Sequence, residues 1–150
     1  MSLFAFNISA REAADLDKLP NNTVLISIND EYVDLYSLKL DRNSPDILTV
    51  QFTDITEDIE HRGKIYHKLD IKTAHKILKF VSTNKSKSFL IHCAAGISRS
   101  SAVSMFIHLR HGHKLKDNFW RTSDPNTHVL GMLIREKIKP LDKLNNKVEF

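Results

Sequence analysis

The sequence has little of the residue types from which disulfide frameworks, membrane spans and flexible linkers are built. Its 150 residues include 1 cysteine, 4 glycines and 4 prolines. A lone cysteine excludes an internal disulfide and favours a reducing compartment, so we expect a cytoplasmic protein. No apolar run reaches the roughly 18 residues that a membrane span needs. The first residues also lack the basic and apolar segments of a signal peptide.

The remaining composition is that of an ordinary globular domain, but its charge is unevenly divided. Hydrophobic residues make up 41% of the chain and charged residues 27%. Residues 1–60 carry 4 Lys/Arg and 12 Asp/Glu, whereas residues 61–150 carry 18 and 6, so the balances are −8 and +12. The basic part would attract an anionic substrate. Lys72, Lys76 and Lys79 are more typical of an exposed helix face.

Strands and helices are predicted to alternate along the chain. Apolar runs predict strands at 3–8, 23–28, 47–52 and 88–92. Capping and periodicity predict a short helix from the capping box Ser9–Glu12 to near Pro20, one or two helical turns within 31–38, and a helix over 71–83 with Asp70 as N-cap. A fourth helix is predicted over about 98–110, with Gly112 as its C-terminal stop. The last helix is predicted to have Pro125 at its first position, and its inward-facing residues are Val129, Leu130, Leu133 and Ile134.

This alternation predicts an α/β fold with a central, mostly parallel sheet flanked by helices. We found no internal repeat, low-complexity segment or linker. We therefore expect a single domain over residues 1–140, a polar tail over 141–150, and a monomer.

The most informative segment joins the strand at 88–92 to the helix after it. It reads His92-Cys93-Ala94-Ala95-Gly96-Ile97-Ser98-Arg99-Ser100. A tight loop between a strand and a helix start directs several backbone N–H groups to one point, where the helix dipole adds partial positive charge. The segment is therefore predicted to be an anion-binding loop, with the N–H groups from Ala94 to Arg99 around the ligand.

The side chains of this segment fit a reaction of a thiolate with a bound phosphate. The amides, the helix dipole and Arg99 all favour the thiolate form of Cys93. Arg99 offers a planar fork that fits two phosphate oxygens. Gly96 allows a sharp turn and a close approach to a ligand. Ser100 can donate to the sulfur, and His92 can fix the loop through its ring nitrogens.

His-Cys, five residues, Arg-Ser resembles the signature loop of the cysteine-based protein tyrosine phosphatases. The form Ala-Gly-Ile-Ser-Arg-Ser is most similar to the dual-specificity branch. This resemblance implies a three-layer phosphatase fold, attack by Cys93, and phosphate held by Ala94, Ala95, Gly96, Ile97, Ser98 and Arg99. The resemblance covers about residues 20–138 in the general pattern of the sequence, and it is specific only over residues 88–103. The alternative is a buried, inert cysteine.

A phosphomonoesterase also needs a general acid for the leaving oxygen, and family members carry an aspartate on a loop after an earlier strand. Asp54 follows the predicted strand 47–52 directly, at the strand end where functional loops gather. Asp58 is the rival, because it is closer to Cys93 in sequence. We prefer Asp54, since loop lengths vary.

Other polar residues have two readings each. His108, His111 and His113 have ligand-like spacing but are also typical of a helix C-terminus, so we expect no metal and no cofactor. Asn126 lies in a segment that resembles one before the last helix of many dual-specificity phosphatases, or it simply starts a helix. The tyrosines that could line the pocket or pack are Tyr32, Tyr36 and Tyr66.

The sequence thus predicts a metal-independent phosphomonoesterase that acts on phosphotyrosine and on phosphoserine or phosphothreonine in proteins. The apolar side chains of Ala94, Ala95 and Ile97 favour a protein substrate over phosphoinositides or RNA 5′-phosphates, whose enzymes often have basic loop residues. A non-catalytic phosphate-binding module is a second alternative, and the intact Cys93 and Arg99 argue against it. No aromatic and basic residues interleave as nucleic-acid binding requires, so we expect neither a nucleic-acid nor a membrane partner.

Overall fold

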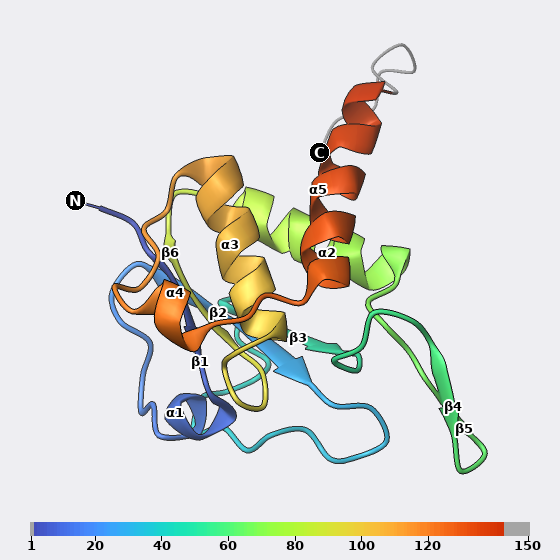
Figure 1. Cartoon of the computed structure of the whole chain (residues 1–150). Helices are drawn as coiled ribbons and strands as arrows, with labels where there is room; N and C mark the ends of the chain where they lie inside the picture. Colours follow the sequence, from blue (N-terminus) through green and yellow to red (C-terminus); the bar gives the residue numbers. More distant parts are fainter. Residues whose placement is uncertain (1, 143–150) are drawn as a thin grey trace.

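The fold is built around four parallel strands, as the computed structural model of the chain shows (Figure 1). The structure describes residues 2–142, with side chains up to residue 137. The strands are β1 (Ala5–Ile8), β2 (Thr23–Asn29), β3 (Ile47–Gln51) and β6 (Ser88–His92), in the order β1-β6-β2-β3. All seven residues of β2 are buried, as expected for a strand paired on both sides. The predicted α/β class with a parallel central sheet is confirmed.

Three helices cover one face of the sheet. They are α2 (Ile71–Thr83), α3 (Arg99–His111) and α5 (Thr127–Asp142). Their apolar sides meet one set of alternating strand residues, which includes Val24, Ile26 and Ile28 of β2. This period of two buries one face of each strand under the helices and leaves the other face for a second layer.

The second layer is thinner and mostly irregular. A smaller core of Leu25, Ile47 and Leu90 lies on the other set of strand residues. The apolar side chains that pack against it include four from irregular segments, Leu16, Leu19, Leu38 and Leu40. The only regular element between β1 and β2 is the short helix α1 (Ala10–Ala14), which starts with the predicted capping box of Ser9 and Glu12.

The sequence predicted the long helices best. Helix α2 has the predicted bounds, its N-cap is Asp70, and its buried residues are Ala74, Ile77, Leu78 and Val81. Helix α3 ends at Gly112, which is left-handed as a C-terminal stop requires. On α5, Val129 and Leu133 are fully buried, while Leu130 and Ile134 are partly buried against the same core.

Three sequence predictions were wrong. Residues 31–38 form a turn and an irregular segment, because side chains satisfy the backbone: Tyr36 N–H donates to Asn29, and Arg42 donates to the Tyr36 carbonyl. Helix α1 ends at Ala14 rather than near Pro20, since the following chain turns its leucines onto the sheet. Pro125 is not the first residue of α5, because the Asn126 side chain accepts from Val129 N–H and the helix begins at Thr127.

Two short elements were not predicted. Strands β4 (Ile59–His61) and β5 (Lys64–Tyr66) form an antiparallel hairpin that projects from the body (Figure 1). Five of its six strand residues are exposed, so it has no buried apolar run to reveal it. The other element is the single-turn helix α4 (Phe119–Thr122), which buries Phe119.

The predicted tail falls mostly outside the described part of the chain. Helix α5 runs through Pro140 to Asp142, past the expected boundary at residue 140, and residues 143–150 lie outside the described residues. Among the described residues, no helix has both the length and the apolar character that crossing a membrane requires.

The cap of α2 leads to a stability prediction. Asp70 accepts from Thr73 N–H at 2.7 Å, and Asp70→Ala should lower the free energy of unfolding by about 1 kcal/mol. Partial burial raises the pKa of Asp70, but the hydrogen bonds from Thr73 outweigh it and hold that pKa below its usual value of 3.8. The stabilisation should therefore be complete above about pH 5 and disappear as the pH falls below 4. Urea unfolding across pH measures this. Lys76→Ala, an exposed change one turn further along α2, should show no such pH dependence.

Candidate active site

The carboxyl ends of the parallel strands bring the predicted site residues together. Strand β6 ends at His92 and is followed by the segment Cys93–Ser98, hereafter the anion loop, which leads into α3. Strand β2 ends next to Asp30, and β3 ends shortly before Asp54. Because the strands run in one direction, these residues share one edge of the sheet.

The carbonyl groups of the anion loop are held by donors from outside the loop. The four bonds are Ala10 N–H to Ala94 O (3.0 Å), Asn7 Nδ2 to Gly96 O (2.7 Å), Asp124 N–H to Ile97 O (2.9 Å) and Asn126 N–H to Ser98 O (3.0 Å). Two of these donors belong to the β1–α1 junction, and two belong to the segment before α5. The loop is therefore held from both sides with its carbonyls directed outward.

The backbone N–H groups of the same loop remain available. Within the described residues, the N–H groups of residues 94–98 donate to no carbonyl or side chain. Ala94, Ala95 and Ile97 are exposed, so the loop is open to a ligand. Free N–H groups beside the N-terminus of α3 form the anion-binding arrangement that the sequence predicts.

Gly96 makes the sharp turn that the sequence predicts and also meets a packing constraint that the sequence did not indicate. Its φ is +75°, and a Cβ at this position would lie 2.5 Å from the Ile8 carbonyl carbon and 2.6 Å from Ser9 N. The glycine is needed because the loop packs against the end of β1 on its outer side. The close approach is to the protein's own backbone.

Cys93 and its neighbours lie at the base of the loop. The thiol is 3% exposed, and its Sγ is 3.1 Å from Ser100 Oγ. The His92 ring is fully buried, with Nδ1 3.1 Å from the Cys93 carbonyl and Nε2 2.6 Å from Ser27 Oγ. Ser100 and His92 therefore have the contacts that their predicted supporting roles require.

Arg99 is 3% exposed and is held by the ends of two strands. Its Nη1 donates to Phe52 O at 2.7 Å, and its Nη2 forms an ion pair with Asp30 Oδ1 at 2.7 Å. Its buried Nε has no hydrogen-bond partner. The second N–H of Nη1 faces Asn29 O at 3.5 Å. A guanidinium has five N–H groups, so the Nε–H and one Nη2 N–H are left for an anion. Sequence reasoning missed Asp30, whose position directly after a buried strand, like that of Asp54, could have identified it.

Asp54 lies at the rim of the anion loop. One of its oxygens, Oδ1, accepts from Ser98 Oγ at 2.8 Å and from Asn126 Nδ2 at 2.8 Å. Asn126 is also the helix-start residue that the sequence offered as one alternative, since its Oδ1 accepts from Val129 N–H at the start of α5. Asp58 is exposed and accepts from Lys68 N–H at 3.0 Å, near the hairpin. The structure therefore brings Asp54, and not Asp58, into contact with the loop.

Two of the three histidines near the end of α3, His108 and His113, form hydrogen bonds with backbone carbonyls. His108 Nδ1 is 2.8 Å from His113 O, and His113 Nε2 is 2.8 Å from Lys87 O. Burial, together with nearby Arg110, lowers the pKa of His111 to about 4. No group of three or more potential metal ligands of the His, Cys, Asp and Glu types occurs in the described part of the chain.

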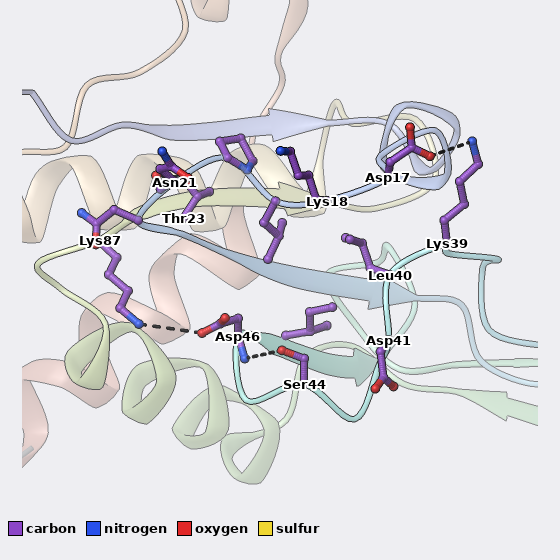
Figure 2. A pocket seen from close by; sticks show the side chains of 14 residues that line it. Asp17, Lys18, Asn21, Thr23, Lys39, Leu40, Asp41, Ser44, Asp46 and Lys87 are labelled. Atoms are coloured by element: carbon purple, nitrogen blue, oxygen red, sulfur yellow. Dashed lines mark hydrogen bonds and ion pairs between the residues drawn. The ribbon is translucent and has the colours of Figure 1, made fainter.

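Two hollows lie at opposite ends of the sheet. A cavity of about 470 Å³ adjoins the loop, between Asp54, Ile59, Ser98 and Pro125. A larger one, of about 590 Å³, lies at the amino ends of β2 and β3 (Figure 2). Four of its charged side chains form two ion pairs, Lys39 with Asp17 and Lys87 with Asp46. The smaller cavity is therefore the one that continues the candidate site.

Comparisons with known proteins give weak likenesses only. No protein-family model matches the sequence, and no curated protein does. Among solved structures, the human tyrosine phosphatase-like serine/threonine/tyrosine-interacting protein is 20% identical over 79% of this chain and 78% of that chain, with a TM-score of 0.45. Tk-PTP in its active form is 17% identical over 99% of this chain and 95% of that one, with a TM-score of 0.45. TM-scores below 0.5 assign neither family nor activity, so residue roles must come from this chain's own geometry.

The contact of Gly96 with β1 predicts a large effect of one methyl group. Gly96→Ala should lower the free energy of unfolding by about 3 kcal/mol, because it combines left-handed strain with a clash against backbone. Gly112→Ala is the matched control. Its φ of +78° is similar, but a Cβ there meets nothing within 4 Å, so about 1 kcal/mol is expected. Equal losses in urea unfolding would contradict the packing role of Gly96.

Proposed function

We propose that the protein is a cysteine-dependent phosphomonoesterase. The observation that carries this proposal is the anion loop itself, whose carbonyls are held outward while its N–H groups stay free between Cys93 and Arg99. Asp54 at the rim supplies an acid on the side where a leaving group would depart. A nucleophile, an anion site and an acid in one place are what phosphoryl transfer to sulfur requires.

In the proposed complex, the N–H groups from Ala94 to Arg99 hold the phosphate oxygens. The free Nε–H and the remaining Nη2 N–H of Arg99 add a fork that fits two oxygens. Asp30 and the Phe52 carbonyl fix the plane of this guanidinium before the ligand arrives, so little ordering remains to be done on binding.

The proposed reaction has two steps. The Cys93 thiolate attacks phosphorus, the bond from phosphorus to the ester oxygen breaks, and Asp54 gives its proton to the departing oxygen. This leaves a cysteinyl-phosphate and an ionised Asp54. Asp54 then takes a proton from water, the water oxygen attacks phosphorus, and the sulfur–phosphorus bond breaks. Ser100 donates to the departing thiolate, 3.1 Å away. No step uses a metal or a cofactor.

The proposed substrates are phosphotyrosine and phosphoserine or phosphothreonine in proteins. Ala94, Ala95 and Ile97 are exposed and apolar, and they offer no additional cation for the further phosphates of a phosphoinositide. Glu57, which lines the cavity beside the loop, would repel such a polyanion. We further propose that the protein acts in the cytoplasm as a monomer.

Replacing the nucleophile should abolish turnover. Cys93→Ser should lower hydrolysis of an aryl phosphate by at least about 10⁴-fold, because a serine hydroxyl stays protonated at neutral pH. The assay is run in EDTA, since the proposed chemistry needs no metal. Thermal unfolding of the variant should match that of the wild type. Substantial activity in Cys93→Ser would exclude the mechanism. A wild type that binds phosphotyrosyl peptide without hydrolysing it would instead be a phosphate-binding module.

The proton donor can be identified by the leaving-group dependence of its variants. Asp54→Asn should slow hydrolysis of a phosphotyrosyl peptide by about 10²–10⁴-fold. It should slow an aryl phosphate with an acidic phenol much less, because that leaving group needs little protonation. It should also flatten the basic limb of the pH–rate profile. Asp58→Asn, the matched control, should do neither. If Asp58→Asn alone shows the leaving-group dependence, the acid is Asp58.

A further inference from the structure

A row of polar residues crosses three apolar strands directly beneath the anion loop. His92 of β6 lies in register with Ser27 of β2, and Ser27 lies in register with Thr49 of β3. The preceding row on the same face consists of Leu90, Leu25 and Ile47. Residues in register share a face in a parallel sheet, so one polar row follows an apolar one at the edge that carries the site.

Arg42 lies over this polar row. Its Nη1 donates to Ser27 Oγ at 3.0 Å and to Thr49 Oγ1 at 2.9 Å, and its Nη2 donates to the Tyr36 carbonyl. It forms no ion pair with a carboxylate among the described residues. A partly buried cation held by two hydroxyls and a carbonyl is costly unless its charge serves something nearby.

The hydrogen bonds from Arg42 through Ser27 and His92 to the Cys93 carbonyl all donate in one direction. The Cys93 carbonyl can only accept, so His92 Nδ1 carries the hydrogen. Burial lowers the pKa of His92, as do Arg42 and Arg99, which outweighs the opposite effect of the Cys93 carbonyl, so the ring is neutral at pH 7. Nε2 then accepts from the Ser27 hydroxyl. The Ser27 oxygen in turn accepts from Arg42.

We propose that Arg42 is a positioning residue for the anion loop, acting through Ser27 and His92 on the Cys93 carbonyl. The chain fixes the Nδ1–H tautomer of His92, which holds that carbonyl on the side away from the ligand. In a trans peptide the N–H points opposite to the carbonyl, so the N–H of Ala94 is directed into the loop. Each bond polarises the next, which moves the effect of the Arg42 charge towards the thiolate. The effect on the thiolate rests on the proposed function.

A second branch joins Arg42 to the other end of the loop. The Tyr36 whose carbonyl Arg42 holds donates its hydroxyl to Asp30 Oδ2. Asp30 Oδ1 forms the ion pair with Arg99. Burial and Asp30 raise the pKa of Tyr36 to about 12, so the phenol stays a donor at neutral pH. One guanidinium therefore supports both Cys93 and Arg99.

The tautomer of His92 tests this series of hydrogen bonds directly in the unmodified protein. Long-range ¹H–¹⁵N correlation spectra assign the hydrogen to one ring nitrogen. We expect the Nδ1–H form in the wild type and a mixture in Ser27→Ala, which removes the only hydroxyl between Arg42 and His92. A wild-type ring with its hydrogen on Nε2, or an unchanged tautomer in Ser27→Ala, would overturn the inference without any assumption about catalysis.

The reactivity of Cys93 towards iodoacetamide at pH 6 tests the consequence. Arg42→Met keeps an apolar stem but removes the charge, and it should lower the alkylation rate about tenfold, as should Ser27→Ala. Arg42→Lys should restore part of the rate. Thr49→Val is the matched control, because Thr49 contacts the same Arg42 nitrogen but does not lead to His92, and it should stay within about twofold of the wild type.

The outcomes separate this inference from the proposed function. If wild-type Cys93 reacts no faster than a free cysteine, both the proposed nucleophile and its tuning by Arg42 are wrong. If wild-type Cys93 reacts fast and Arg42→Met and Ser27→Ala react equally fast, the proposed function stands and the role of Arg42 is refuted. Equal losses in Thr49→Val and Ser27→Ala would show general loosening of the sheet edge and would also refute it.

Discussion

The site depends on the outward hydrogen bonds of four carbonyl groups in one short loop. A buried backbone must satisfy its polar groups, and a strand-to-helix turn leaves both carbonyls and N–H groups without regular partners. Here the carbonyls of Ala94, Gly96, Ile97 and Ser98 take their donors from outside the loop. The N–H groups are consequently left together on the other side. The anion site is the part of the loop that the protein does not satisfy itself.

The need for these outside donors explains the positions of β1 and of the segment before α5. Strand β1 is at the edge of the sheet beside β6, where Asn7 and Ala10 at its end reach the loop. The segment before α5 supplies the other two donors, and Asn126 there both caps the helix and holds Asp54. The position of the proposed acid is therefore coupled to the start of α5 through the Asn126 side-chain amide and to the loop through the Ser98 hydroxyl.

Arg99 and Arg42, one buried and one partly buried, have different kinds of partner. Arg99 has a carboxylate partner in Asp30, whereas Arg42 is held by hydroxyls and a carbonyl. In the proposed complex the dianion lies against Arg99, which is buried, so water screens little of the interaction. The buried Nε of Arg99 has no hydrogen-bond partner among the described residues, and an unpaired buried N–H costs free energy. A bound phosphate would remove that cost, which gives binding part of its driving force.

The sequence by itself determined the elements with strong local signals. Helix α2, its cap and its inner face follow from periodicity and one aspartate, and strands β2 and β6 follow from continuous apolar runs. The segment from Cys93 to Ser100 was recognisable because several residue types at fixed spacing serve one chemistry. The hairpin of β4 and β5 was missed because short, exposed strands have no apolar pattern. The helix expected within 31–38 failed because Asn29 and Arg42 compete for the backbone there.

Only the tertiary structure decided which distant residues serve the site. Position after a strand made Asp54 the preferred acid and left Asp58 as its rival, whereas hydrogen bonds from Ser98 and Asn126 bring only Asp54 to the loop. Arg42 carries no local signal, and the position of Asp30 after β2 does not reveal that its partner is Arg99, because both contacts depend on strand order and register. The order β1-β6-β2-β3 brings the ends of β2 and β3 beside β6. Pairing across strands depends on contacts between residues far apart in the chain, and no local pattern of residues encodes which partners will meet.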